Sequence, residues 1–539
     1  MTKRKSFFDS KYTLCISSGI FLGFSFPPFH FGWLAFVGFV PLLFAIDASE
    51  NYKEVFKLSY IAFLLFNVVV IYWVGGWTKE ADPFLMIGGA ALVLGHPLFF
   101  TIPFLVYHYI KRRLLFIPNF SLFIFPFLYL SFENLHSITE VAFPWLTIGY
   151  SQSYNLADIQ FASFTGLFGI SFQILIVNVL LYYALLSWLE NRTAMKRKIM
   201  VSLLVVFLLI SVPEIYGLNI LNSTTRLDYP RSLKVSLVQP NIDPYAKWSG
   251  SPSEILQEYE NETYQLIGQK PALVVWPETA IPFYILLPQN YYFKHELQTF
   301  LDATDISLLS GVPLATYYSN LVEAKPSSHY DEMMRKFYDA YNGAALFEPK
   351  SSTDQTYAKI ILVPFGERIP YADDVPWLIK PLSWGVGISN WAQGKDTTVF
   401  KLSGGVTFSA VICYESIFPN YVRQFVKKGA NFLVIITNDG WYGKSSGPFQ
   451  HAAYATLRAV ENRRAVVRAA NTGISEFIDP YGRLIGRQTK LDEKTTLTAE
   501  IPIDEQMTFY TEHGDWIPHF AEIISTGVIL IGVFLKFKK

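Results

Sequence analysis

The chain has 539 residues, of which 51% are hydrophobic, 17% aromatic and only 16% charged. This composition excludes an ordinary water-soluble globular protein and indicates a membrane protein, and the length indicates more than one domain. Basic and acidic residues balance at 44 each, so the formal net charge is zero and no overall field favours a nucleic acid or an acidic partner.

Apolar residues are concentrated in a predicted transmembrane domain, residues 1–220. The basic start and first apolar stretch resemble a secretory signal peptide, but no small-residue cleavage site is clear and further spans follow. Eight stretches come close to the ~20 residues needed to cross a bilayer. They cover about 12–26, 31–46, 57–77, 84–108, 114–134, 161–189, 199–218 and 517–535, the last lying in a C-terminal span at 515–539.

Basic clusters predict the orientation of these spans. They lie at 3–5, 53–57, 111–113, 192–198 and 536–539. With eight spans, all five fall on one side of the membrane, which the positive-inside rule makes cytoplasmic. Both termini are then cytoplasmic, and the domain at 225–510 is extracytoplasmic.

Residues 225–510 have the mixed composition of a water-soluble domain. Short apolar or alternating runs predict strands there, and two stretches have helical spacing. The predicted strands are 232–239, 272–276, 306–312, 342–347, one starting near 357, 408–412, 430–436, 466–470 and 475–478, and the helices are 253–268 and 451–464. Because apolar strands repeatedly end in polar or reactive residues, we expect a layered α/β or α+β domain with its site at the strand ends.

Cys413 directly follows one of these apolar runs, and Cys15 is the only other cysteine, so a disulfide framework is excluded. Taken alone, Cys413 is most simply a small buried hydrophobe, and Cys15 an apolar residue facing lipid or a helix. Two further polar residues change that interpretation: Glu278 ends the run at 272–276, and Lys359 lies at the start of the predicted strand near 357.

An acid, a lysine and a cysteine, each beside an apolar run, form a plausible set for acyl transfer. A thiol attacks as its thiolate, whose unperturbed pKa is ~8.5. The Glu278 carboxylate could take the proton as general base, and the Lys359 ammonium could stabilise the thiolate and an oxyanion. His451 is a rival base, and spacing alone does not choose between it and Glu278. The sequence contains no Gly-rich phosphate loop, HExxH, CxxC or His/Cys cluster, so we expect no metal and no nucleotide cofactor.

Three motifs carry a resemblance to a known superfamily. Glu278 ends Val-Val-Trp-Pro-Glu, Lys359 precedes Leu-Val-Pro-Phe-Gly-Glu, and Cys413 lies in Ile-Cys-Tyr-Glu. They look like the Glu-Lys-Cys triad of the nitrilase superfamily, whose fold is an αββα sandwich. A nitrilase-like domain that follows about seven spans and precedes a final one resembles the apolipoprotein N-acyltransferase family. The resemblance covers nearly the whole chain. Further matching stretches are 143–145, 149–152, 238–241, 247–248, 437–443 and 447–451.

This resemblance implies an α-helical membrane bundle of about eight spans plus an α/β nitrilase-like αββα sandwich. It makes Glu278 the base and Cys413 the nucleophile, with Lys359 stabilising the tetrahedral intermediate. The supporting residues that it implies are Glu367 and Glu415 for charge and geometry, and Tyr414 and Trp248 lining the acyl or substrate site. Ile361 stands where the family often has His, and His451 takes a structural or rim role.

The implied reaction is ping-pong. Cys413 takes an acyl chain from a membrane phospholipid as a thioester, and the α-amine of diacylglyceryl-cysteine at a lipoprotein N-terminus then takes it. The resemblance implies a monomer in the bacterial inner membrane, with no cofactor, no metal and no nucleic-acid partner.

Two other functions remain open from the residues alone. A membrane-tethered amidase or nitrilase that hydrolyses a small amide would share the triad and pass the acyl group to water. A transporter or sensor would need buried ionisable residues within its spans, and few mid-span charges occur. The polar stretch 315–340 is a candidate for a mobile arm that gates the cysteine.

Overall fold

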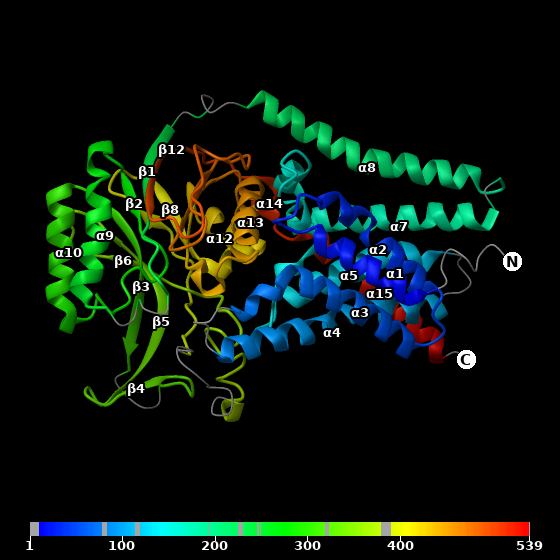
Figure 1. Ribbon diagram of the computed structural model, residues 1–539, viewed down its shortest axis with the longest axis horizontal. Coiled ribbons are helices and arrows are strands. Elements are labelled where there is room, and N and C mark those ends of the chain that lie inside the picture. Colours follow the sequence, from blue (N-terminus) through cyan, green and yellow to red (C-terminus); the bar gives the residue numbers. More distant parts are fainter. Residues whose placement is uncertain are drawn as a thin grey trace. The chain divides into compact units, whose positions relative to one another are not determined.

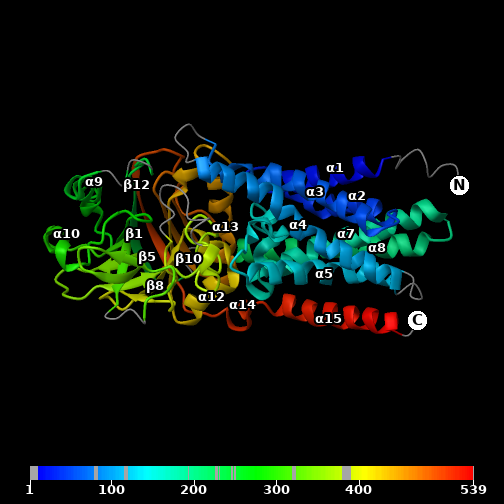
Figure 2. The same ribbon diagram turned by 90° about the horizontal axis from the view of Figure 1, so that it is seen from below.

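The computed structural model describes most of the chain, and its elements are drawn in Figures 1 and 2. The described residues are 10–77, 83–113, 119–191, 193–224, 229, 231–244, 247, 250–318, 323–378 and 390–537. The chain divides into two compact units. One comprises Met1–Gly75, Ile87–Thr224 and His513–Lys539, and the other Gly76–Met86 and Thr225–Glu512.

The first unit is built from long apolar helices. Ser10 and Asn51 cap two of them by accepting hydrogen bonds from the backbone N–H groups of Thr13 and Glu54. The helices are α1 (Lys11–Phe24), α2 (Ala35–Asp47), α3 (Tyr52–Ile71), α4 (Pro83–Arg113, of which 83–86 belong to the second unit), α5 (Phe120–Ser137), α6 (Ala162–Thr165), α7 (Leu167–Asn191), α8 (Lys196–Ser223) and α15 (Trp516–Phe537). Figure 1 shows α7 and α8 side by side, as their contacts require.

Packing in this unit relies on small residues and aromatic rings. A Cβ at Gly19 of α1 would lie 2.3 Å from the carbonyl oxygen of Ala62 in α3, so glycine permits the two backbones to approach closely. Phe39, Phe63 and Tyr129 come from α2, α3 and α5 and are fully or almost fully buried, with ring centroids 5.0–6.4 Å apart. These three helices therefore bury apolar faces against one another.

Five helices among the described residues are long and apolar enough to cross a membrane, compared with the eight spans expected. They are Tyr52–Gly75, Leu85–Arg113, Leu167–Asn191, Lys196–Ser223 and Trp516–Leu535. The expected spans at 12–26 and 31–46 correspond to α1 and α2, which have only 14 and 13 residues and are separated by a segment that contains Pro27 and Pro28. The span expected at 114–134 begins on residues outside the described ones, and α5 has 18 residues.

The second unit is a pair of mixed sheets with strands that are parallel at their centres. In its described residues, the first sheet has seven strands in the order β12-β1-β2-β3-β5-β4, with β6 pairing β5, and the second has five in the order β11-β10-β9-β8-β7. The strands of the first are β1 (Arg231–Gln239), β2 (Leu273–Val275), β3 (Leu308–Tyr317), β4 (His329–Asp331), β5 (Lys336–Phe347), β6 (Gln355–Ala358) and β12 (Thr495–Ile503). Those of the second are β7 (Phe400–Lys401), β8 (Thr407–Ile412), β9 (Phe432–Thr437), β10 (Ala465–Ala470) and β11 (Glu476–Ile478).

Apolar residues on both faces of the strands create a four-layer arrangement. In β2, Leu273 and Val275 pack into the core between the sheets, whereas Val274 packs with helices on the outer face. The outer helices are α9 (Pro252–Tyr264) and α10 (Tyr291–Thr304) on the first sheet, and α12 (Pro419–Lys427) and α13 (Gly447–Asn462) on the second. Figure 2 shows these helix pairs on opposite sides of the two sheets, which is the expected αββα sandwich.

Most predicted strands of this unit are present, with one consequential exception. Lys359 does not begin a strand: β6 ends at Ala358, and Lys359 follows it. The apolar residues after it form a loop and not the predicted strand. The backbone N–H groups of Ile360 and Ile361 in this loop bind the Glu415 carboxylate instead of a neighbouring strand. The sequence analysis also missed β4, β7, β12, α10 and α12.

The suggested mobile arm at 315–340 is partly regular. Its described residues include the end of β3, all of β4 and the start of β5, and β4 pairs antiparallel with β5. Residues 319–322 lie outside the described ones. The gating role of the arm stays a prediction.

Replacing Phe408 with alanine should destabilise the second unit strongly. Its fully buried ring stacks between Phe400 and Phe432, at centroid distances of 5.4 and 5.1 Å. Truncation would remove buried area and leave a cavity, costing about 3–5 kcal/mol. Urea unfolding of the detergent-solubilised protein, followed by near-ultraviolet circular dichroism, would measure it. The exposed Tyr264→Ala should change stability by about 0.5 kcal/mol or less; equal effects of the two variants would contradict this packing.

Candidate active site

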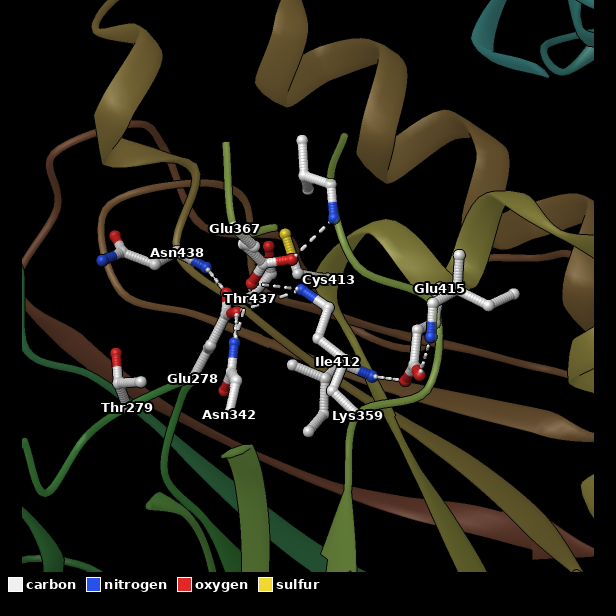
Figure 3. A network of polar contacts seen from close by, with 12 residues as sticks. Glu278, Thr279, Asn342, Lys359, Glu367, Ile412, Cys413, Glu415, Thr437 and Asn438 are labelled. Atoms are coloured by element: carbon white, nitrogen blue, oxygen red, sulfur yellow. Dashed lines mark hydrogen bonds and ion pairs between the residues drawn. The ribbon is translucent and has the colours of Figure 1, made fainter. Parts of the chain in front are cut away.

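Polar side chains from both sheets meet where their parallel strands end. Glu278 follows β2 in the first sheet, and Cys413 follows β8 in the second. Lys359 follows β6, which pairs with β5 of the first sheet. Figure 3 shows Glu278, Lys359 and Glu367 converging beside Cys413. The structure thus brings together the three residues predicted from sequence as a triad.

Glu278 is a buried carboxylate held by two hydrogen-bond donors and one ion pair. Its Oε1 accepts from Asn342 Nδ2 at 2.8 Å and lies 3.6 Å from Lys359 Nζ. Its Oε2 accepts from the backbone N–H of Asn438 at 3.0 Å. The backbone around it is tightly packed, because a Cβ at Gly311 would lie 2.7 Å from the Glu278 Cα. The carboxylate is therefore fixed in one orientation, as a general base requires.

Lys359 is almost completely buried and lies between two acids. Its Nζ is 2.8 Å from Glu367 Oε1 and 3.6 Å from Glu278 Oε1. Burial alone would lower the pKa of Lys359, but the negative charges of Glu367 and Glu278, with the Cys413 thiol nearby, outweigh it and raise the pKa above its usual value. The side chain is therefore an ammonium, a fixed positive charge beside the thiol.

Cys413 occupies a strained turn at the end of β8. Its φ is +52°, a left-handed conformation that non-glycine residues rarely adopt, and it opens a short 3-10 turn, Cys413–Ile417. The residue is partly exposed. Desolvation raises the pKa of the thiol, the Glu278 charge raises it further, and Lys359 partly opposes both. The resting group is therefore a thiol that needs a base.

Glu415 connects the Cys413 turn to the loop that carries Lys359. Its Oε1 accepts from the N–H of Ile360 at 2.7 Å and from that of Ile361 at 3.2 Å, and its Oε2 accepts from the N–H of Ile412 at 2.9 Å. Burial raises its pKa, and its hydrogen bonds, first of all the one from the Tyr357 hydroxyl, partly counter that. Ile361 contributes only its backbone N–H to this contact. An isoleucine where the family often has His therefore does not remove the hydrogen bond to Glu415.

Glu367 closes the same loop from the other end. Its Oε2 accepts from the N–H of Val363 at 2.8 Å, and its Oε1 binds both Lys359 and Asn342. Glu367 and Glu415 both contact the loop that carries Lys359, and their supporting role stays a prediction. Tyr414, directly after Cys413 in the sequence, is buried, and its ring packs on Phe418. Trp248, the other expected lining residue, lies outside the described residues.

His451 does not face the thiol as a rival base. Its Nε2 lies 3.2 Å from the backbone carbonyl oxygen of Cys413 and 2.8 Å from Ser416 Oγ. Its Nδ1 lies 2.9 Å from Asp439 Oδ1. It is buried, so a rim position does not describe it. Glu278 is the acid whose charge acts most strongly on the Cys413 thiol.

Sequence reasoning missed Asn342 and Lys247. Asn342 Nδ2 donates to Glu278 at 2.8 Å and to Glu367 at 3.0 Å. Lys247 Nζ, also buried, donates to the Glu278 carbonyl oxygen at 3.1 Å and to Thr279 Oγ1 at 3.3 Å; burial lowers its pKa to about 7 against the pull of Glu278. The available signal for Asn342 was a polar residue at the start of the predicted strand 342–347.

No group of three or more His, Cys, Asp or Glu side chains in the described residues could hold a metal ion. The side chains assembled here are instead a carboxylate, an ammonium and a thiol. Such a set can move a proton, attack a carbonyl carbon and stabilise the resulting oxyanion.

Comparisons with known proteins agree with this geometry. A family model named carbon-nitrogen hydrolase matches residues 234–507, and one named apolipoprotein N-acyltransferase N-terminal domain matches 18–180. An apolipoprotein N-acyltransferase of Chlorobaculum tepidum is 37% identical over 538 residues, covering 97% of each chain. The chain belongs to the apolipoprotein N-acyltransferase family. A Geobacter metallireducens family member is 32% identical over 513 residues, covering 94% of this chain and 92% of its own.

Membership of the apolipoprotein N-acyltransferase family confirms the resemblance predicted from sequence. The chain is a membrane protein and an enzyme of the nitrilase superfamily. An amidase from Nesterenkonia sp. AN1 also aligns, with 18% identity and a TM-score of 0.38 over 54% of this chain and 98% of its own. That score is too low to support an argument, and the nitrilase-like fold rests on the family match and the two sheets.

Replacing Asn342 with aspartate should reduce the rate of acyl transfer by about 10- to 100-fold. This is the rate change that corresponds to the free energy of one hydrogen bond to a charged group. The change keeps the side chain's size but places a third carboxylate against Glu278 and Glu367. Transfer from phospholipid to a diacylated lipopeptide, followed by mass spectrometry, measures it. Asn431→Asp is the matched control, since Asn431 Oδ1 only accepts, from Thr407. Full activity of the Asn342 variant would show that Asn342 does not hold the two acids.

Proposed function

We propose that the chain transfers an acyl chain from a membrane phospholipid, through a Cys413 thioester, to the N-terminal amine of diacylglyceryl-cysteine in lipoproteins. The observation that carries this proposal is the convergence of Glu278, Lys359 and Cys413 at the strand ends of two facing sheets. Family membership supports the lipoprotein acceptor. The phospholipid donor and a monomeric enzyme complete the proposal.

In the first half-reaction, the Glu278 carboxylate takes the proton of the Cys413 thiol. The thiolate attacks the ester carbonyl of the phospholipid, forming a C–S bond and a tetrahedral oxyanion that the Lys359 ammonium stabilises. The C–O bond to the glycerol then breaks, and Glu278 returns its proton to the departing alkoxide. The products are lysophospholipid and an acyl-thioester on Cys413.

In the second half-reaction, the α-amine of the lipoprotein attacks the thioester carbonyl. Glu278 takes a proton from the amine, and Lys359 again faces the oxyanion. The C–S bond breaks, the amide forms, and Glu278 returns the proton to the departing thiolate. One carboxylate thus carries the proton in both directions, and its two fixed oxygens suit that task.

The membrane spans would give the catalytic domain access to its lipid substrates. We propose a transmembrane domain at 1–220, a catalytic domain at 225–510 outside the cytoplasm, and a final span at 515–539, with eight spans in total and both termini cytoplasmic. The five long apolar helices support part of that count. Spans on both sides of the catalytic domain would keep it beside lipid substrates whose tails stay in the outer leaflet of the bacterial inner membrane.

Incubating the purified protein with phospholipid, without acceptor, should add the mass of one acyl chain, removable by hydroxylamine. Cys413→Ser should carry no thioester. Glu278→Gln should form the adduct at least 100-fold more slowly, because a general base contributes roughly 10²–10⁴-fold. Intact-protein mass spectrometry measures all three.

Two results would contradict this proposal. Release of free fatty acid without lipopeptide acylation, when lipopeptide is supplied, would make water the acceptor and favour a membrane-tethered amidase or hydrolase. An acyl adduct that persists in Cys413→Ser would move the nucleophile to another residue.

Cysteine labelling tests the proposed orientation. In a variant with Cys15→Ser and Cys413→Ser, a membrane-impermeant maleimide should label Tyr264→Cys in intact spheroplasts. Lys53→Cys should react only after lysis, because it lies in a cytoplasmic basic cluster under the positive-inside rule. Both positions are exposed on their own units. Labelling of both from outside would refute the eight-span count.

A further inference from the structure

The proposed base, Glu278, lies in a four-residue turn that follows β2, residues 277–280. The N–H of Ala280 donates to the carbonyl oxygen of Pro277 at 3.3 Å and closes this turn. Thr279 is the third residue of the turn and has a φ of +47°. A type II turn needs a positive φ at this position and usually has glycine or asparagine there. A β-branched residue in this conformation is an outlier, so neighbouring contacts must hold it.

Lys247 binds two oxygen atoms of this turn. Its Nζ donates to the Glu278 carbonyl oxygen at 3.1 Å and to Thr279 Oγ1 at 3.3 Å, and all three residues are buried. A carbonyl oxygen can only accept, and a lysine amine carries hydrogens in both its neutral and its protonated form. The hydrogen bond to the carbonyl is therefore donated by Lys247 in either form and does not depend on its charge.

The loop that carries Lys247 is itself held in place. Asn471, directly after β10, binds Ile242 of this loop in both directions. The Ile242 N–H donates to Asn471 Oδ1 at 3.0 Å, and Asn471 Nδ2 donates to the Ile242 carbonyl oxygen at 2.7 Å. Asn471 Nδ2 also donates to Asn438 Oδ1 at 3.1 Å, and the backbone N–H of Asn438 binds the Glu278 carboxylate. One connected set of contacts thus holds both the carboxylate and the backbone of Glu278.

We propose that Lys247 is a positioning residue for Glu278, which holds the left-handed Thr279 turn and thereby fixes the direction in which the base meets the Cys413 thiol. The inference deepens the proposed function and rests on Glu278 being its base and Cys413 its nucleophile. Lys247 touches no substrate in this account and carries no proton in the reaction. Its whole effect passes through Glu278.

The packing of the turn explains why this contact matters for the base. A Cβ at Gly311 of β3 would lie 2.3 Å from the backbone nitrogen of Thr279 and 2.7 Å from the Glu278 Cα, so one side of the turn has no free space. Without Lys247, Thr279 could relax towards a negative φ, which would rotate the peptide that joins it to Glu278. The carboxylate would then move, and a displacement of about 1 Å in a reacting group can reduce a rate by about 100-fold.

Single-turnover thioester formation from phospholipid, followed by intact-protein mass spectrometry, tests this inference. Lys247→Met keeps the length of the side chain but leaves the buried Glu278 carbonyl oxygen without its donor. Thioester formation should slow by about 10- to 100-fold. The KM for phospholipid should stay within about twofold of the parent value, because Lys247 does not bind the substrate.

Lys234→Met is the matched control. Lys234 is exposed on β1, and its Nζ donates to a backbone carbonyl oxygen, that of Gln269, at 3.1 Å. The same substitution there removes the same kind of hydrogen bond away from the turn. Its rate should stay within about twofold of the parent, as expected of a surface change.

Two combinations separate positioning from general packing. Glycine adopts a positive φ without strain. Adding Thr279→Gly to Lys247→Met should therefore recover at least about fivefold of the lost rate. Glu278→Gln has no base left to position, so adding Lys247→Met to it should slow thioester formation by no more than about twofold. If Lys247→Met does not fold, Lys247→Gln takes its place in every comparison.

Three results would overturn the inference and leave Lys247 a packing residue. They are a parent-like rate in the Lys247 variant, no recovery with Thr279→Gly, and a further slowing of Glu278→Gln by about tenfold or more. Failure of the proposed function looks different. In that case Cys413→Ser would still form the acyl adduct, whatever the rates of the Lys247 variants.

Discussion

The proposed active site depends on one buried ammonium shared by two carboxylates. Lys359 Nζ binds Glu367 at 2.8 Å and lies 3.6 Å from Glu278, while Asn342 Nδ2 bridges the same two oxygens. Two carboxylates this close would otherwise repel one another and any thiolate formed beside them. The ammonium makes their proximity possible, and the proposed proton transfer from the thiol to Glu278 requires that proximity. Removing Lys359 would therefore disturb the whole group and not the oxyanion contact alone.

The two sheets supply the geometry that this charge arrangement needs. Parallel strands deliver Glu278 from one sheet and Cys413 from the other, and the backbone N–H of Asn438, after β9, reaches across to Glu278. Glu415 then fastens the Lys359 loop to the Cys413 turn through three backbone N–H groups. Rigid strands carry the reacting groups, and buried acids fix the loops between them, so each group is held in place before substrate arrives.

Much of this site could be predicted from sequence, because short apolar runs ending in Glu278 and Cys413 reveal strand ends directly. The prediction for Lys359 was only partly right. The residues after it are apolar enough for a strand, but their backbone N–H groups bind the buried Glu415. Asn342 and His451 could not be assigned, since their roles depend on which strands become neighbours. The count of eight spans shows a further limit: the first two expected spans are present as α1 and α2, but these helices have 14 and 13 residues, fewer than the ~20 needed to cross a bilayer.

The most direct test of the account is an experimental structure of the protein after incubation with phospholipid in the absence of acceptor. The account predicts continuous density from Cys413 Sγ into an acyl chain, with the thioester carbonyl oxygen within hydrogen-bond distance of Lys359 Nζ and Glu278 beside the sulfur. An acyl chain attached to another residue, or a thioester whose oxygen points away from Lys359, would contradict it.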